Sequence, residues 1–236
     1  MAKFDEPLHL NTGNRSVMIG GKPPEMVKSD LEAGVARLGG FWRHPNYFES
    51  YIYSASVLIE QGRATGTLDE IGLPGFYLQR HSIELLLKEL LGWLTSISEL
   101  RNQLGRSVSK PSDGLLRDMR RSHDIVDLYS HVIELADMLN LSPPPDELGS
   151  LISEMETLEI TETWSRYRSS SRKLENSGVR LHVDHIPHEV VIPIVEFQER
   201  LDTIACLTSS REAFGDAYED ELHEVWSELN AAIENY

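Results

Sequence analysis

Four ionisable side chains recur at helical spacing within residues 74–94, a stretch that is otherwise rich in leucine: Arg80, His81, Glu84 and Lys88. At 3.6 residues per turn, His81, Glu84 and Lys88 fall within about 60° of one another on the helical cylinder. Arg80 lies to one side of them. Charged groups rarely enter a protein interior unless they are paired. The stripe therefore either closes into an ionic network or lines a cleft, where imidazole and carboxylate groups can move protons.

Two interpretations of this stripe are open. Glu84 precedes Lys88 by four residues, which is the favourable order for an ion pair along a helix. Buried ionic clusters can serve only to specify packing. The first interpretation is accordingly a packing device, and the second is a pocket lining that binds a phosphate-bearing ligand.

A second group of chemistry-bearing residues lies at 182–189, with the sequence His-Val-Asp-His-Ile-Pro-His-Glu. Its imidazole and carboxylate groups could bind a metal ion, because His and Asp are ordinary zinc ligands. In an extended strand, however, His182 and Asp184 share one face while His185 points away. The spacing, which includes His188, matches no closed structural zinc site, so we favour a solvated loop and assign no metal or cofactor. A metal-dependent hydrolase that uses this segment is the third functional hypothesis.

Two segments of the chain resemble the HEPN superfamily of helical proteins. Gln79-Arg-His-Ser-Ile-Glu-Leu-Leu-Leu-Lys is similar to the Gln/Arg–Glu–Lys stripe on the second long helix of that family. His123-Asp-Ile-Val-Asp-Leu-Tyr is similar to the His-Asp-Leu opening of its next helix. Trp164-Ser-Arg166-Tyr167 is also similar to the family's Arg-Tyr-Pro segment, with Arg168 in place of the proline. The resemblance covers residues 46–207.

This resemblance implies an α-helical bundle, frequent dimerisation and a role directed at RNA or a nucleotide. Catalytic members of the family are metal-independent ribonucleases of toxins and anti-phage defence systems, and many other members are non-catalytic. The first functional hypothesis is therefore a ribonuclease or toxin-type effector that acts on RNA. The second is a non-catalytic module that binds a nucleotide or a partner protein, such as an antitoxin. A homodimer is the expected state.

Catalytic members of the family carry an Arg that is followed, after four to six residues, by a His. Three pairs in the chain have this form: Arg37 with His44, Arg117 with His123, and Arg180 with His185. The family usually places a polar residue directly after the Arg, and only Arg117 is followed by one, Asp118. We therefore select Arg117 and His123 as the candidate catalytic pair.

The implied chemistry is in-line attack of an RNA 2′-hydroxyl on the adjacent phosphorus. His123 would take or give the proton, because imidazole titrates near neutral pH. Arg117, Arg120 or Arg166 would offset the charge that builds on the phosphoryl oxygens, and Tyr167 joins them in the candidate phosphate site.

His123 is also expected to begin a helix, where free N–H groups and the helix dipole favour a bound phosphate. The alternative is that His123 only caps this helix, with its imidazole bonded to a neighbouring carboxylate such as Glu84.

These candidate residues must be positioned by helices, because apolar residues recur at helical spacing along most of the chain. Pro74 is expected in the first turn of a central helix that reaches Leu104. Ser122 is expected to cap a helix that ends near Asn140. Pro193 is expected in the first turn of another, with the core face Ile194, Phe197, Leu201, Ile204 and Leu207. Further helices are expected at 25–38, 46–62, 146–158 and 216–235, a loop at 159–180, and a short strand or extended chain at 179–183.

The predicted fold is all-α: a HEPN-like bundle of five to six helices with mostly antiparallel neighbours and a flexible N-terminal arm. Residues 1–45 form the arm and residues 46–210 form the helical domain. Residues 211–236 form an acidic helix that packs on this domain or extends it.

The composition limits the classes of function. A net charge of −16 argues against a surface that binds nucleic acid by bulk electrostatics. Residues 101–121 and 166–180 are locally basic, however, so a focused basic site on an acidic body is open. No apolar run approaches the length of a membrane span. The single cysteine, Cys206, excludes an internal disulfide and fits the cytoplasm.

Overall fold

The computed structural model describes residues 24–39, 46–105, 121–158, 164, 168–173, 180–209 and 216–234. Its helices are α1 (Pro24–Ala33), α2 (Tyr47–Thr65), α3 (Leu68–Gln103), α5 (Ile125–Met138), α6 (Asp146–Leu158), α7 (Ile194–Thr208) and α8 (Tyr218–Glu234). The predicted all-α bundle is confirmed, with α2, α3, α5, α6, α7 and α8 packed together. No helix in this part of the chain combines the length and apolarity that a bilayer crossing demands.

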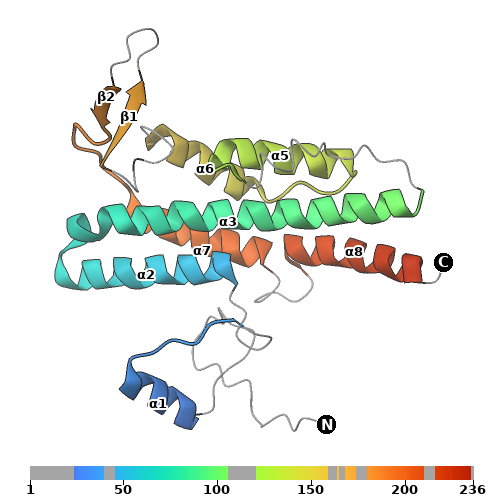
Figure 1. Cartoon of the computed structure of the whole chain (residues 1–236), viewed down its shortest axis with the longest axis horizontal. Coiled ribbons are helices and arrows are strands. Elements are labelled where there is room, and N and C mark those ends of the chain that lie inside the picture. The colour runs from blue at the N-terminus through green and yellow to red at the C-terminus, as the bar shows by residue number, and fades with distance from the viewer. Residues whose placement is uncertain are drawn as a thin grey trace.

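A small antiparallel hairpin adds to the helices. It pairs β1 (Ser169–Lys173) with β2 (Arg180–Asp184). Strand β1 lies in a segment that we expected to be loop. For residues 179–183 we expected a short strand or extended chain, and β2 shows that this segment contains a strand. In Figure 1, the hairpin projects above the helical body and α1 lies below it.

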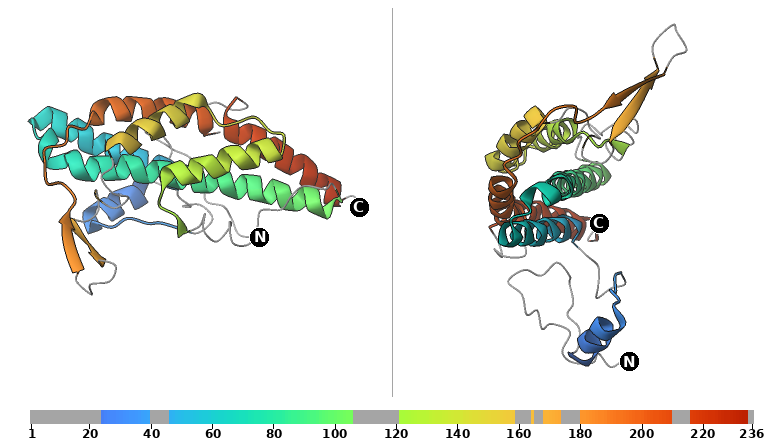
Figure 2. Two further views of the ribbon diagram at one scale, coloured as in Figure 1. Left: turned by 90° about the horizontal axis from the view of Figure 1, so that it is seen from above. Right: turned by 90° about the vertical axis from the view of Figure 1, so that its left-hand side faces the viewer.

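Helix α3 is the axis of the bundle, as its apolar sequence predicts. It has 36 residues, which corresponds to a length of about 54 Å. Helices α2, α5, α7 and α8 all pack against it. In the views of Figure 1 and Figure 2, α5 and α6 lie on one side of it and α2 on the other. Its fully buried side chains include Leu86, Leu87, Leu90 and Leu94.

The helix starts earlier than predicted, because α3 begins at Leu68 and Pro74 lies in its interior. Proline there removes one backbone hydrogen bond. The two preceding turns are supported by the end of α2, where a Cβ on Gly62 would lie only 2.7 Å from Ile71 Cγ1. This close packing stabilises the turns that precede the proline.

Some neighbouring helices depart from the antiparallel arrangement that we expected for most of them. Arg80, in the first half of α3, contacts His123 just before α5, and Arg101, near the end of α3, contacts Leu139 just after it. Helices α3 and α5 are therefore parallel. Helices α7 and α8 follow one another along α3 in the same direction (Figure 1). Only short connections force neighbouring helices to be antiparallel, and the chain between 104 and 124 is long enough to return to the first half of α3.

The start of α5 differs by two residues from the prediction. Asp124, and not Ser122, is the N-cap, since its carboxylate accepts from the N–H groups of Val126 and Asp127 over 2.9 Å and 3.1 Å. Ser122 Oγ instead accepts from the N–H of Asp124 over 3.1 Å. His123 consequently lies just outside the helix, where its side chain can turn back toward α3.

The core is one apolar cluster around α3. Phe76 is fully buried in this cluster, with its ring 5.2 Å from that of Trp164 and 6.3 Å from that of Phe197. The predicted core face of α7 is buried except for Leu207, which is 39% exposed. Leu207 lies in the last turn of α7, where it lines a surface hollow instead of the core.

Candidate functional site

The carboxylate of Glu84 lies at the centre of an ionic cluster on the middle of α3. Its side chain is only 3% exposed. Lys88 Nζ donates to Oε1 over 2.8 Å, and His123 Nδ1 lies 2.9 Å from the same oxygen. On the other side, His81 Nδ1 lies 3.5 Å and Arg80 Nη1 lies 3.9 Å from Oε2. We call these five residues the Glu84 cluster.

Two separate segments build this cluster. One stripe of α3 supplies four of the five side chains, as the helical spacing predicts, and the segment that precedes α5 supplies His123. Arg80 Nη2 donates to the backbone carbonyl of His123 over 2.8 Å, while Glu84 holds its imidazole. His123 is therefore fixed at both its backbone and its side chain.

The electrostatics of the cluster keep Glu84 ionised. Burial by itself raises the pKa of a carboxyl group. Hydrogen bonds from His81, Lys88 and His123, together with the charge of Lys88, outweigh that effect and hold the pKa of Glu84 well below its usual range. Glu84 is thus a permanent hydrogen-bond acceptor near neutral pH, and it is not a proton donor.

The members of the cluster differ in how far they reach solvent. The side chain of His123 is 47% exposed and that of Lys88 is 25% exposed, whereas that of Arg80 is 4% exposed. We assign the shared proton to His123 Nδ1, because a carboxylate can only accept. The other ring nitrogen, Nε2, forms no hydrogen bond with any of the described residues. Arg80 is buried and positions His123 instead of meeting a phosphate.

An aromatic group adjoins the cluster. The ring of Tyr77 stacks on that of His81 at 5.5 Å and 8°, and the ring of Tyr51 meets His81 edge-on at 4.7 Å and 81°. Sequence reasoning missed both tyrosines as site residues. Tyr77 could have been found, because it precedes His81 by one helical turn and extends the same stripe. Tyr51 comes from α2, and only the tertiary fold brings it close.

Several predicted residues lie outside the described part of the chain: Arg117, Arg120, Arg166 and Tyr167. The pairing of Arg117 with His123 therefore stays a prediction. Arg37, from another Arg–His pair, forms an ion pair with Asp30 of α1 at 2.9 Å.

The histidine-rich segment does not converge on a metal site. His185 is fully buried, whereas His182, Asp184 and His188 are exposed. Among the described residues, no group of three or more His, Cys, Asp and Glu side chains is placed to hold a metal ion. The geometry of this segment therefore gives the metal-dependent hydrolase no support.

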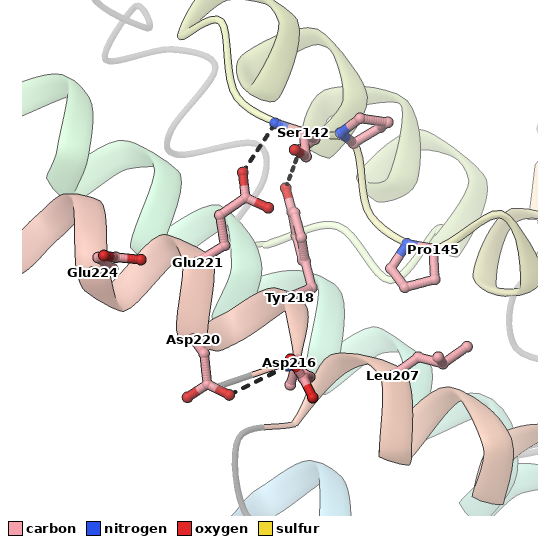
Figure 3. A pocket seen from close by; sticks show the side chains of 10 residues that line it. Ser142, Pro145, Leu207, Asp216, Tyr218, Asp220, Glu221 and Glu224 are labelled. Atoms are coloured by element: carbon pink, nitrogen blue, oxygen red, sulfur yellow. Dashed lines mark hydrogen bonds between the residues drawn. The ribbon is translucent and has the colours of Figure 1, made fainter. Parts of the chain in front are cut away.

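A hollow of about 660 Å³ opens between the loop after α5 and the junction of α7 and α8. In Figure 3, the hydroxyl of Tyr218 donates to the Ser142 carbonyl over 2.9 Å. Burial and the nearby Glu221 carboxylate raise the pKa of Tyr218, so this hydroxyl keeps its proton. Four carboxylates line the hollow: Asp216, Asp220, Glu221 and Glu224. Their charge disfavours a phosphate, and the hollow lies at the opposite end of α5 from His123, about 20 Å along the helix.

Comparisons with known proteins give no match. No protein-family model, no curated protein and no solved structure is significantly similar to this chain. The resemblance to the HEPN superfamily therefore stays a prediction from the motifs at residues 79–88, 123–129 and 164–167.

Proposed function

We propose that this chain is a HEPN-like, metal-independent ribonuclease in which His123 transfers the proton and Glu84 orients it. The observation that carries the proposal is the 2.9 Å contact between a buried, permanently ionised carboxylate and a half-exposed imidazole. A carboxylate that holds Nδ1–H fixes the tautomer and leaves Nε2 as the basic nitrogen. It also stabilises the imidazolium that forms when Nε2 accepts a proton.

The proposed reaction begins when Nε2 of His123 takes the proton of an RNA 2′-hydroxyl. The 2′-oxygen then forms a bond to the adjacent phosphorus as the bond from phosphorus to the 5′-oxygen breaks. The departing oxygen receives a proton, either from the imidazolium or from water. The products are a 2′,3′-cyclic phosphate and a 5′-hydroxyl, and no redox partner is needed.

The local charge suits a phosphodiester despite the acidic body of the protein. Within the five residues of the Glu84 cluster, the permanent cations Arg80 and Lys88 outnumber the one carboxylate, that of Glu84. Lys88 is the partly exposed cation of the pair. In the proposal, Arg117, Arg120 or Arg166 offsets the charge that builds on the phosphoryl oxygens.

A second candidate function is a non-catalytic module that binds a nucleotide or a partner protein. This function is favoured because the Glu84 carboxylate contacts Lys88, His81 and His123 at the same time. Such a network is able to serve packing alone. Under either function, the family resemblance suggests a homodimer and a role in a toxin–antitoxin or defence system, and the single cysteine, Cys206, suggests the cytoplasm.

The decisive experiment incubates the purified protein with total RNA in the presence of EDTA. We expect cleavage by the wild-type chain and a loss of at least about 100-fold in the His123→Ala variant, a typical contribution of general acid–base catalysis. His131→Ala is the matched control. His131 lies on α5 and also contacts carboxylates, with Nε2 3.5 Å from Asp127, but it is not part of the Glu84 cluster.

Three outcomes separate the hypotheses. Cleavage that resists EDTA and disappears only in His123→Ala supports the ribonuclease. Absence of cleavage together with a thermal shift on addition of nucleotides supports the binding module instead. Cleavage that requires added zinc or manganese contradicts both functions and supports the metal-dependent hydrolase that uses residues 182–189.

A further inference from the structure

We infer that Tyr77, His81 and Tyr51 form an aromatic wall that binds an unpaired nucleobase of the RNA substrate. This inference rests on the proposed ribonuclease function and assigns the part of the substrate that the site recognises. It goes beyond the cleavage chemistry, because none of the three residues takes part in the proton transfer.

The aromatic wall and His123, the proposed general base, contact the same carboxylate, that of Glu84. His81 contacts Oε2 of Glu84 and His123 contacts Oε1. Since both oxygens belong to the same group, the two Nδ1 atoms are separated by no more than roughly 9 Å, the sum of the two contacts and the width of a carboxylate. The span of one nucleotide is comparable with this upper limit. A base stacked against the wall would therefore place its own phosphate next to His123.

The geometry of the three rings suits stacking. Tyr77 and His81 are almost parallel, at 8°, and form the beginning of a stack that a base could extend. Tyr51 meets His81 edge-on at 81° and fixes the orientation of its ring. Aromatic stacking contributes about 1–3 kcal/mol per base and tolerates every base, because each has a π face.

The environment of the wall differs from that of the core aromatics. Phe76 and Phe197 are fully buried, whereas Tyr51, Tyr77 and His81 are all partly exposed. A buried tyrosine usually finds a hydrogen-bond partner for its hydroxyl. Neither Tyr51 nor Tyr77 makes such a bond with the described residues, as expected for rings at a surface that meets a ligand.

The wall selects single-stranded RNA over a duplex. Bases in an A-form helix are stacked on one another, and their faces are not accessible to side chains. An unpaired base in a loop or at an end can leave its neighbours and stack on the protein.

The test measures binding of a fluorescent, single-stranded 2′-O-methyl oligonucleotide by anisotropy, because this probe cannot be cleaved. We expect Tyr77→Leu to weaken binding about tenfold and Tyr77→Phe to leave it unchanged, since phenylalanine keeps the ring. Tyr51→Leu gives an independent test from another helix. Tyr53→Leu is the matched control, because Tyr53 is a tyrosine of α2 that is 49% exposed and lies outside the wall. Circular dichroism establishes that each variant is folded.

The outcomes distinguish this inference from the proposed function. Unchanged binding by folded Tyr77→Leu and Tyr51→Leu, while His123→Ala still abolishes cleavage, overturns the aromatic wall and leaves the ribonuclease intact. Equal binding of the single strand and of its duplex also overturns the wall. A protein that never cleaves RNA but whose binding depends on Tyr77 overturns the ribonuclease and supports the wall as a nucleobase site.

Discussion

Replacement of Glu84 by Gln preserves the size of the side chain but removes the charge that surrounding cations contact. The amide oxygen can still accept from Lys88 and His123, whose bonds share Oε1. The amide nitrogen would then face Arg80, a guanidinium that is only 4% exposed. Removal of one partner of a buried ion pair costs about 3–5 kcal/mol. Arg80 keeps its bond to the His123 carbonyl, so we take about 3 kcal/mol from the lower end of that range.

For a chain of this size, that loss corresponds to a fall in Tm of roughly 6–12 °C. Thermal unfolding followed by circular dichroism measures it. Glu99→Gln is the matched control, because Glu99 is an exposed acid of the same helix, and it should change the stability by less than about 0.5 kcal/mol.

The difference in the free energy of unfolding between the wild type and Glu84→Gln should also depend on pH. The pKa of Glu84 is lowered in the folded state, so its stabilisation is fully present above the unfolded value of about 4.3. It is lost as the pH falls below that value toward the folded pKa. Urea unfolding should therefore give a difference that is present at pH 7 and becomes smaller below about pH 4. A difference of less than about 1 kcal/mol at pH 7, typical of surface ion pairs, would refute the buried network.

Three further substitutions test other parts of the structure. Asp124→Ala removes the N-cap of α5 and should cost about 1 kcal/mol in urea unfolding; it should also slow RNA cleavage, since the cap holds the segment that carries His123. Phe76→Ala opens a cavity between Trp164 and Phe197 and should cost about 3–5 kcal/mol in the same assay; a loss below about 1 kcal/mol would place Phe76 outside the core. Tyr218→Phe removes the hydroxyl bond to the Ser142 carbonyl and should lower stability by about 1 kcal/mol, while RNA cleavage stays at the wild-type rate.

The helices could be predicted from the sequence because their signals are local. Apolar spacing and the prolines before Asp146 are sufficient to place α6 at Asp146–Leu158. The interior position of Pro74 could not be predicted, because it depends on contacts between Gly62 and Ile71 of two different helices. The parallel direction of α5 likewise depends on the path of a long connection, which carries no periodic signal.

The residues of the candidate site that belong to one helix could also be predicted, whereas the contacts between helices could not. Helical spacing is enough to place His81, Glu84 and Lys88 on one face, because all three belong to α3. The contact between His123 and Glu84 arose from the sequence only as the alternative to catalysis, and the structure shows this contact at 2.9 Å. In the proposed function, the same contact orients the imidazole for proton transfer. Tyr51 could not be found, because its place beside His81 depends on how α2 packs against α3.

The most direct test of the central claim is the identity of the ends that the protein leaves on a single-stranded RNA oligonucleotide in the presence of EDTA. Mass spectrometry of the fragments distinguishes the two kinds of phosphodiester cleavage. The account predicts 2′,3′-cyclic phosphate and 5′-hydroxyl ends from the wild-type chain, and intact RNA from His123→Ala. Fragments with 3′-hydroxyl and 5′-phosphate ends, or the same fragments from His123→Ala as from the wild type, would contradict it.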